Sequence, residues 1–385
     1  MKILINCNYY FPGNKSGGNL ISVNNLIKET SSNHNYYLIT RDRDLGDIEP
    51  YKGIAKNQWI EKEFYKVKYI SKKKQTFLNF KNIINKNNYD LIYLNSFFDL
   101  FSIKILILNK LRLIKKIPIL LCSKGELSEN SLKIKSFKKK VFFLIFKNFI
   151  NLYSNIYFLA STKNEYMEIV KHKFKNIKQI YVAQDIFIKK KIKYENAIKF
   201  DSKKILKLCY VSRITPKKNL LKLLYFLSEI KINYCLDIYG HIDDKNYFDK
   251  CKKIIKKINT NSKKISYLGV LNHDKVVEKL NMYHLFILLT KNENFGHIIS
   301  ESFNAGTPVL LSNETIWNNL QKLKIGWNIN INNSKEFNAV LDYLYKCSDN
   351  DYINIRKNIF KYFNDLIVDD SIKQNLKVLE KIKAN

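Results

Sequence analysis

Short apolar runs alternate with longer amphipathic stretches along most of the chain. The runs are four to seven residues long and apolar at consecutive positions, which is typical of parallel strands buried on both faces. Between them, apolar residues recur at helical spacing, as Leu20, Val23 and Ile27 do. Such alternation predicts a doubly wound α/β sheet. In the first half the predicted strands are Lys2–Cys7, Tyr36–Thr40, Leu91–Leu94, Ile117–Cys122, Ile156–Ser161 and Gln179–Val182.

The alternation pauses in a polar, Lys-rich stretch and then starts again. We therefore predict two α/β domains, residues 1–185 and 204–350, with a linker over residues 186–203 and a helical segment over residues 351–385. The strands predicted for the second domain are Leu206–Ser212, Cys235–Tyr239, Ile265–Leu268, Leu285–Leu289 and Pro308–Ser312. Its predicted helices are Leu220–Ile230, Tyr247–Ile258, Asp274–Asn281 and one that begins near His297.

The chain is strongly basic, with 67 Lys and Arg against 34 Asp and Glu among 385 residues and a net charge of +33. Its 46% of hydrophobic residues excludes a disordered chain. Only five of the basic residues are Arg, whereas surfaces that bind nucleic-acid phosphates usually use the bidentate Arg side chain. We therefore attribute most of the charge to a compositional preference for lysine and expect no nucleic-acid partner. A basic nucleic-acid-binding protein remains an alternative, and it would give no role to the motifs below.

The six cysteines and six histidines are scattered, without a C-x-x-C pair or the spacing of a zinc site. We expect buried, reduced thiols, a cytoplasmic location and no metal site. No apolar run approaches the roughly 20 residues that span a bilayer. The first residues pass directly into a strand pattern, so we expect no secretory leader.

Two glutamates eight positions apart mark the first candidate site. The predicted strand Leu285–Leu289 ends just before Glu293, Gly296 allows a tight turn, and Glu301 falls in the first two turns of the next helix. A helix N-terminus suits a phosphate or sugar oxygen, and carboxylates accept hydrogen bonds from sugar hydroxyls. Taken alone, the two glutamates favour the simpler interpretation, in which Glu301 caps the helix and Glu293 is a solvated loop residue.

Two cations follow the first strand of the second domain and mark the second candidate site. Arg213 and Lys218 come directly after strand Leu206–Ser212, and ligands of open α/β sheets bind at the carboxyl ends of strands. An Arg at this place in so Arg-poor a chain is a sharp signal. The pair could neutralise a diphosphate leaving group.

These motifs resemble those of retaining glycosyltransferases of family 4, which have the two-domain GT-B fold. The resemblance rests on the segment from Ser212-Arg213 to Lys218-Asn219, on Glu293 to Glu301, and on Ala305-Gly306-Thr307-Pro308-Val309. Gly17-Gly18 resembles the glycine pair of the family's first loop, and residues 123–128 resemble a segment of a subgroup that assembles surface polysaccharides. The fold implied is α/β: two Rossmann-like, doubly wound parallel-sheet domains facing a cleft.

The resemblance also implies roles for individual residues. Arg213 and Lys218 would hold the diphosphate of a nucleotide-sugar, and Glu301 its ribose. Glu293 and the backbone at Asn294, Phe295 and Gly296 would hold the donor sugar. Further donor-binding residues implied are Gly17 and Gly18, and Lys124 stands where many members carry a catalytic His.

Three departures from the family pattern are plain: Ser212 and Asn219 replace glycines, and the interdomain turn is Ala183-Gln184-Asp185. The implied transfer needs no metal cofactor. The sequences Asp42-Arg43-Asp44 and Asp349-Asn350-Asp351 do have the D-x-D pattern of the other large glycosyltransferase fold, but we expect each to mark a turn.

The function implied is a hexosyl- or N-acetylhexosaminyltransferase that uses a UDP- or GDP-linked sugar. Its acceptor would be a glycan or lipid-linked glycan of a bacterial surface polysaccharide: capsule, O-antigen or lipooligosaccharide. A sugar-nucleotide epimerase of the same fold is the main alternative, and product analysis without an acceptor separates the two.

The segment of residues 131–150 is the most basic part of the chain. Residues 101–150 hold 12 basic and two acidic groups, and lysines in the segment interleave with large apolar residues. The pattern predicts a helix with a cationic face. Such a helix can lie on an anionic membrane surface, on the inner face of the cytoplasmic membrane, or pack into its domain with a solvated lysine face, and both interpretations stay open.

Overall fold

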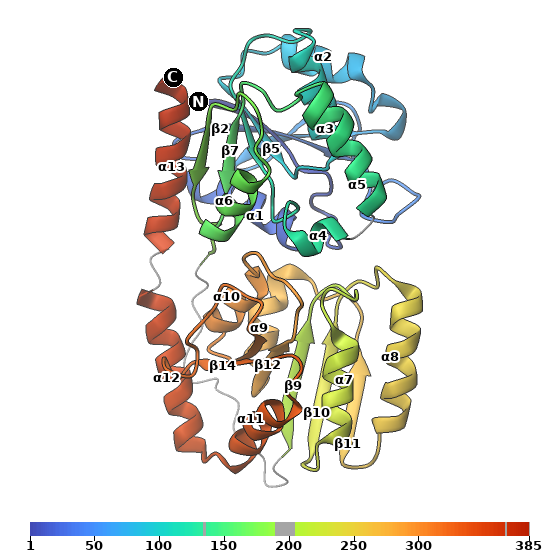
Figure 1. Ribbon diagram of the computed structural model, residues 1–385, viewed down its shortest axis with the longest axis vertical. Helices are drawn as coiled ribbons and strands as arrows, with labels where there is room; N and C mark the ends of the chain where they lie inside the picture. Colours follow the sequence, from blue (N-terminus) through green and yellow to red (C-terminus); the bar gives the residue numbers. More distant parts are fainter. Residues whose placement is uncertain (134–135, 189–204, 366–367, 385) are drawn as a thin grey trace. The chain divides into compact units, whose positions relative to one another are not determined.

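A computed structural model describes residues 1–133, 136–188, 205–365 and 368–384. The chain divides into two units: unit 1 comprises Met1–Ile188 and Val368–Asn385, and unit 2 comprises Lys189–Ile367. Each unit is a parallel sheet covered by helices (Figure 1), which confirms the predicted pair of parallel-sheet α/β domains. From residue 189 onward, the predicted linker 186–203 lies outside the described residues.

Unit 1 contains an eight-stranded sheet with the order β3-β4-β2-β1-β5-β6-β7-β8. Only β3 runs antiparallel to its neighbour; the other strands are parallel. The strands are β1 (Lys2–Asn6), β2 (Asn35–Arg41), β3 (Trp59–Glu61), β4 (Tyr65–Ile70), β5 (Leu91–Asn95), β6 (Ile119–Cys122), β7 (Tyr157–Ala160) and β8 (Gln179–Val182).

The central strands are mostly apolar because helices cover both faces of the sheet. Side chains of β5 and β6 point alternately into two separate hydrophobic cores, one on each face. The helical segments are α1 (Gly18–Thr30), η1 (Lys72–Lys74), α2 (Phe77–Asn85), α3 (Leu100–Lys110), α4 (Glu129–Lys133), α5 (Ser136–Phe142), the π-helical η2 (Phe143–Phe149), α6 (Lys163–Lys171) and α13 (Val368–Ala384).

The last helix, α13, belongs to unit 1 although it is the end of the chain. It packs on α1, and its Val378, Leu379 and Ile382 are buried in the same core as β1. The sequence analysis treated residues 351–385 as one helical segment, whereas the structure has two helices, α12 in unit 2 and α13 in unit 1.

Unit 2 contains six parallel strands in the order β11-β10-β9-β12-β13-β14. The strands are β9 (Leu206–Val211), β10 (Tyr234–Tyr239), β11 (Lys263–Tyr267), β12 (Leu285–Leu288), β13 (Val309–Ser312) and β14 (Gly326–Ile329). Its helices are α7 (Leu220–Glu229), α8 (Lys245–Ile258), η4 (His273–Lys275), α9 (Val276–Leu280), α10 (His297–Asn304), α11 (Ser334–Lys346) and α12 (Asp349–Asp365).

All eleven predicted strands are present, with ends that differ by two residues at most. Three further strands, β3, β4 and β14, lie at or next to a sheet edge and were not predicted from the sequence. Their sequences mix polar with apolar residues; β4, for example, reads Tyr-Lys-Val-Lys-Tyr-Ile. Strands toward the rim are less buried than central ones, so they lack the continuous apolar run that identifies a parallel strand.

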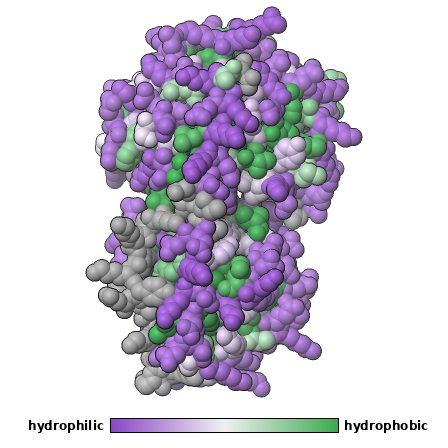
Figure 2. All heavy atoms as spheres, turned by 90° about the vertical axis from the view of Figure 1, so that its left-hand side faces the viewer, coloured by the Kyte–Doolittle hydropathy of each residue, from purple (hydrophilic) through white to green (hydrophobic). Residues whose placement is uncertain are grey.

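The surface of the protein is mainly hydrophilic on the face drawn in Figure 2, as expected for a strongly charged chain. Hydrophobic residues form small separate patches on this face. Within the described residues, every helix is too short or too polar to cross a bilayer.

Each sheet has one point at which the strand order reverses. It lies between β1 and β5 in unit 1, and between β9 and β12 in unit 2. Ligands of doubly wound sheets bind in the crevice outside the carboxyl ends of the strands at such a point. The loops after these four strands are therefore where each unit should bind its ligand.

Candidate active site

An ion pair joins the two motifs of unit 2 at its switch point. The Lys218 ammonium donates to Oε2 of Glu293, and only 14% of each side chain is exposed. Lys218 follows β9 and Glu293 follows β12, which are neighbouring strands. The structure thus brings together two predicted site residues that are 75 positions apart.

The charge state of Glu293 is set by two opposing effects. Burial favours the neutral acid, but Lys218, with smaller effects from Lys217 and Arg213, overrides it and holds the pKa of Glu293 below its usual value. Glu293 is therefore a carboxylate at neutral pH, able to accept hydrogen bonds from hydroxyl groups.

Arg213 lies at the exposed edge of the same site. Its Nη1 is 3.0 Å from Oδ2 of Asp243, and 43% of the side chain is exposed. An exposed ion pair of this kind is worth only about 0.2–1 kcal/mol, so a diphosphate could replace Asp243 at little cost. Asn219, which replaces a family glycine, has φ 61 at the start of α7. Asn tolerates this left-handed conformation, so the loop keeps a turn that glycine would otherwise make.

The N-terminus of α10 follows Glu293. Gly296 has φ 77 there, and a Cβ on it would lie 2.8 Å from Ile299 and 3.0 Å from Cγ of Glu293, so a larger residue would be strained and would have to displace these side chains. The Phe295 side chain is buried, and its carbonyl accepts a hydrogen bond of 2.7 Å from Trp317. This anchoring fixes the turn and leaves the backbone, not the phenyl ring, as the part of Phe295 that could meet a ligand.

Glu301 lies in the second turn of α10, as predicted. Its Oε1 is 3.3 Å from Nδ1 of His273 in η4, and 16% of the glutamate side chain is exposed. His273 was not singled out from the sequence. At the other end of α10, the buried Arg356 of α12 donates to the carbonyl of the C-cap residue Ala305, which stabilises a helix C-terminus.

Two hydroxyls that sequence reasoning missed connect the loops of this site. Thr290, fully buried after β12, donates to the carbonyl of Lys217, and Ser312 at the end of β13 donates to the carbonyl of Thr290. In the sequence, these two residues are marked only by their positions at the ends of strands. Thr and Ser are too common at strand ends for this to identify a site residue.

In unit 1 the glycine pair begins α1. Gly17 is the N-cap with φ 68, and open space surrounds it, so close approach of another group is possible. The preceding loop is fixed by Asp44, whose Oδ2 accepts from the backbone N–H groups of Asn14 and Lys15. Gly18 is the first residue of the helix.

Lys124 forms a buried ion pair on the loop after β6. Its ammonium lies 2.7 Å from Oδ1 of Asp185, with side-chain exposures of 4% and 13%. Burial lowers the pKa of Lys124, but Asp185 outweighs it and the pKa lies well above its usual value. Asp185 also accepts a 2.8 Å hydrogen bond from Ser22 on α1. Lys124 is therefore a permanently charged group, unlike the histidine of the family.

A second buried carboxylate holds the Lys124 loop in place. Glu165 accepts four hydrogen bonds: from the hydroxyl of Ser123 (2.6 Å), the amide of Gly125 (2.7 Å), and the amide (2.8 Å) and hydroxyl (2.7 Å) of Ser161. Four acceptor positions on one carboxylate explain why a charge with 1% exposure is tolerated here. Neither Glu165 nor Asp185 was predicted from the sequence.

The basic segment forms three short helical pieces, α4, α5 and η2, with residues 134–135 outside the described residues. Phe142, Phe143 and Phe146 pack against the core of unit 1. Phe137 and Phe149 remain 78% exposed. One face of the segment therefore packs into the domain, as the second interpretation predicts, and aromatic rings stay exposed among the lysines. The membrane-surface interpretation stays a prediction.

Neither D-x-D sequence forms a cluster of metal ligands. Over the ranges that the structure describes, no group of three or more His, Cys, Asp and Glu side chains could hold a metal ion. Asp42 binds Arg43, and Asp44 binds backbone amides. The expectation of a turn was wrong for residues 349–351, which begin α12.

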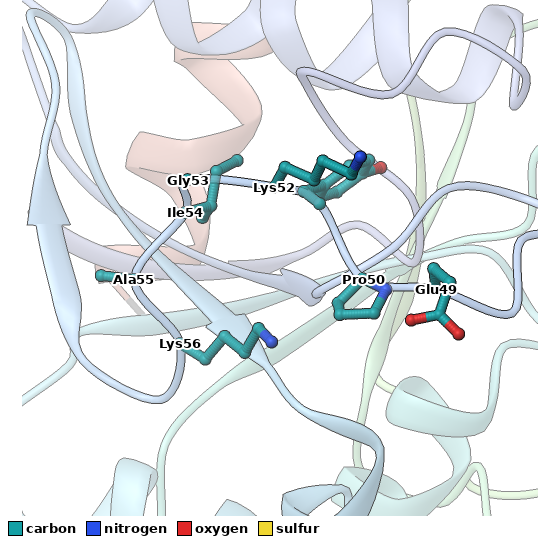
Figure 3. Close-up of a pocket in the computed structure, with 8 residues that line it drawn as sticks. Glu49, Pro50, Lys52, Gly53, Ile54, Ala55 and Lys56 are labelled. Carbon is teal, nitrogen blue, oxygen red and sulfur yellow. The ribbon is translucent and has the colours of Figure 1, made fainter.

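A shallow pocket of about 620 Å³ lies elsewhere in unit 1 (Figure 3). It is lined by residues 49–56, the loop between β2 and β3, with Glu49, Lys52 and Lys56 as its charged side chains. None of the predicted site residues contributes to it.

Comparison with known proteins finds one family model that matches part of the chain and several solved structures with the same fold. Residues 190–362 match the family model described as Glycosyl transferases group 1. No match is found among curated proteins. Among solved structures, HepE of Anabaena, in a complex with UDP and glucose, is similar with a TM-score of 0.67 and 15% identity over 100% of both chains.

Two further solved structures have the same architecture. Sucrose-phosphate synthase of Thermosynechococcus elongatus has a TM-score of 0.69 and 15% identity over 100% of this chain and 99% of that chain. WaaG, a glycosyltransferase involved in lipopolysaccharide biosynthesis, has a TM-score of 0.67 and 12% identity over 98% and 99%. The fold is thus that of GT-B glycosyltransferases, and residues 190–362 of the chain match the Glycosyl transferases group 1 model.

Proposed function

We propose that the protein is a retaining glycosyltransferase that moves a sugar from a nucleotide-sugar to a glycan or lipid-linked acceptor. The observation that carries the proposal is the Lys218–Glu293 pair at the switch point of unit 2, beside Arg213 and the N-terminus of α10. Two cations, one ionised carboxylate and the N-terminus of a helix match the parts of a nucleotide-sugar: a diphosphate and a hydroxylated ring.

Departure of the nucleotide leaves negative charge on the diphosphate, and the site can stabilise that charge. Arg213 and Lys218 provide fixed positive charge, and the α10 N-terminus adds its positive dipole end. We propose that these groups, rather than a metal ion, support the leaving group. Glu293 would orient the donor sugar and Glu301 the ribose. In unit 1, we propose that Lys124 and the Gly17-Gly18 turn have the donor-binding roles that the family resemblance implies.

The HepE complexes with UDP, with UDP and glucose, and with UDP-glucose support a UDP-linked sugar as the first donor to test. WaaG supports a role in the assembly of a surface glycan. The sucrose-phosphate synthase neighbour shows that the same fold also serves soluble sugars, so the acceptor class must be tested directly.

A lipid-linked acceptor would place the protein at the cytoplasmic membrane. We propose that α5 and η2 form the docking surface, with Phe137, Leu144 and Phe149 inserted among lipid headgroups and Lys138 and Lys140 facing them. Each lysine contributes about 1 kcal/mol near an anionic surface. Lys138→Glu with Lys140→Glu should release the protein from phosphatidylglycerol vesicles, whereas retained binding would contradict this surface.

The central experiment measures donor recognition. A panel of UDP- and GDP-sugars is tested for thermal stabilisation and for hydrolysis, first with the native protein and then with Arg213→Ala and Glu293→Ala. We expect one donor to stabilise the native protein, and we expect both variants to lose turnover by about 10²–10³-fold.

The products of that panel separate the alternatives. Release of free sugar with the donor's anomeric configuration supports retention. Conversion of the donor to an epimer, without an acceptor, would identify an epimerase. No response to any donor would contradict the proposal.

A further inference from the structure

Unit 1 has its own cationic group at the carboxyl edge of its sheet, away from the Lys124 pair. Arg41 is the last residue of β2, next to the switch-point strand β1. Its Nε donates to the side-chain oxygen of Asn8, in the loop after β1, and its backbone N–H donates to the Asn8 carbonyl. The guanidinium is therefore fixed relative to the loop that leads to Gly17.

Two aromatic rings contact the Arg41 side chain. Its Cζ lies 5.3 Å from the centre of the Tyr9 ring and 5.4 Å from that of Phe101. Such contacts restrict the rotamers of an arginine without using its N–H groups. The two terminal amino groups, Nη1 and Nη2, have no protein partner among the described residues. They form a pre-organised fork that matches a phosphate or carboxylate.

A second cation lies in the same cluster. The Lys104 ammonium, on α3, donates to the carbonyl of Gln75 and lies 6.0 Å from the ring of Phe80, which itself packs 4.8 Å from the ring of Phe101. Partial burial lowers the pKa of Lys104, and repulsion from Arg41 lowers it further. Two like charges are thus held near one another at an energetic cost that an anion would remove.

The carboxyl group of Asp99 interacts electrostatically with both cations. Asp99 is buried, and burial raises its pKa to about 6 although Arg41 lowers it. Neither Arg41 nor Lys104 forms an ion pair with any described residue, and the same holds for the three exposed lysines of η1, which directly precede Gln75. Arg43 offers a contrast two residues away, because Asp42 neutralises it at 2.9 Å.

We propose that Arg41 and Lys104 form an anion-binding site in unit 1 that takes a phosphate or carboxylate group of the acceptor. This inference rests on the proposed function for the word acceptor, but the site itself can be tested without any donor. It predicts that the acceptor is an acidic or phosphorylated sugar rather than a neutral one. The η1 lysines add attraction at longer range.

The test compares glucose 6-phosphate and glucuronate with glucose as the neutral counterpart, by isothermal titration calorimetry at low ionic strength. We expect binding of at least one anionic sugar and none of glucose. Arg41→Gln should weaken that binding about 10-fold or more, and Lys104→Gln about 3-fold. The matched control for Arg41 is Arg43→Gln, because Asp42 already neutralises the charge of Arg43. The control for Lys104 is Lys178→Gln, because the Lys178 ammonium also lies over an aromatic ring, 4.8 Å from that of Tyr157, but near the other edge of the sheet.

Several outcomes would overturn the inference: no anion binding by the native protein, equal losses in the Arg41 and Arg43 variants, or release of the Arg41 variant from anionic vesicles. The last would mean that the anion is a lipid headgroup. Stabilisation by UDP separates this site from the donor site, since it should be lost in Arg213→Gln and kept in Arg41→Gln. If the native protein shows no glycosyl transfer but Arg41-dependent anion binding persists, the proposed function fails and the site stands.

Discussion

The two units contain the same kind of ion pair but differ in how far their positive charges are exposed to solvent. In both, a lysine that follows a parallel strand pairs with a carboxylate from a later loop: Lys218 with Glu293 in unit 2, and Lys124 with Asp185 in unit 1. In unit 2 a further cation, Arg213, is 43% exposed and held only by an ion pair at the surface. In unit 1 the lysine is 4% exposed and its partner is also bound by Ser22.

This difference teaches how each charge can be used. A cation held by an exposed pair can exchange its partner for a ligand at low cost, whereas a buried pair is fixed because separating it leaves an uncompensated charge. Unit 2 therefore has one cation, Arg213, that can exchange its partner for a diphosphate at low cost. Unit 1 has a permanent cation that shapes its loop, and the exchangeable positive charge there is Arg41.

Glycine substitutions should give the largest contrast between the units. A Cβ on Gly240, after β10, would lie 1.8 Å from the carbonyl oxygen of Ser212, so Gly240→Ala must displace the Arg213 loop. Gly17→Ala meets no atom within 4 Å and costs only the strain of its φ of 68. In urea denaturation we expect Gly240→Ala to lose more than about 4 kcal/mol and Gly17→Ala about 1–2 kcal/mol. If the two variants lost similar amounts of unfolding free energy, the closer packing around Gly240 than around Gly17 would be contradicted.

The buried pair of unit 1 should be the next most sensitive feature. Asp185→Asn leaves the Lys124 ammonium without its counter-charge and should cost about 3–5 kcal/mol of unfolding free energy. Burial then lowers the folded-state pKa of Lys124 below its unfolded value, so between those two pKa values the unfolded chain binds more protons. The deficit of the variant should shrink as pH rises.

Denaturation of Asp185→Asn at several pH values measures this effect, with Asp47→Asn, whose ion pair with Lys15 is 42% exposed on the aspartate side, as the control. A control loss as large as that of Asp185→Asn would show that burial is not the cause. Lys124→Met combined with Asp185→Leu removes both charges and should be more stable than either single variant.

In unit 2 the charge pair should matter more for activity than for stability. Lys218→Gln removes a cation from the proposed leaving-group site and should lower kcat/KM about 10²-fold. Lys222→Gln, one helical turn further along α7, should stay within about twofold because its ammonium lies over the Phe226 ring.

The same variant has a pH signature. Lys218 holds the pKa of Glu293 below its usual value against burial, so its removal raises that pKa. If Glu293 must be ionised, the residual activity of Lys218→Gln should be lost at a higher pH than in the native protein as the pH falls. If the loss of activity at low pH occurs at the same pH in the variant and in the native protein, ionised Glu293 is not needed for turnover.

The smallest expected effect concerns Asp99. Burial raises its pKa from 3.8 to about 6, so between these values the folded protein binds the extra proton and stability falls as pH rises. Native protein should lose about 2–3 kcal/mol relative to Asp99→Asn between pH 3.5 and 6.5. Chemical denaturation over this range measures the difference, with the exposed Asp90→Asn as control. A constant difference would mean that Asp99 titrates normally.

The sequence identified motif residues better than their partners. Arg213, Lys218, Glu293 and Gly296 could be found because each lies within a few residues of a predictable strand end or turn. Asp185 could not, because its role depends on Lys124, 61 positions away. Glu165 and His273 could not be predicted for the same reason, because their partners lie elsewhere in the sequence. Nothing in the neighbouring residues distinguishes a glutamate that binds four loop donors from one that caps a helix.

The element pattern shows the same division. Continuous apolar runs identified the central strands, since both faces of a parallel sheet are buried. The partly polar strands β3, β4 and β14 escaped, as did the return of α13 to unit 1, where Leu379 and Ile382 enter the core. An amphipathic helix has a buried stripe wherever it packs, so its sequence does not name the sheet that it covers.

By itself the sequence determined two parallel α/β sheets, their buried strands and the positions of the charged motifs, because hydrophobic period and turn residues are local properties. Only the tertiary structure decided which charges neutralise one another: Lys218 with Glu293, Lys124 with Asp185, and Arg41 with no carboxylate among the described residues. Pairing depends on distances between loops that follow different strands, and the order of strands in the folded sheet sets those distances.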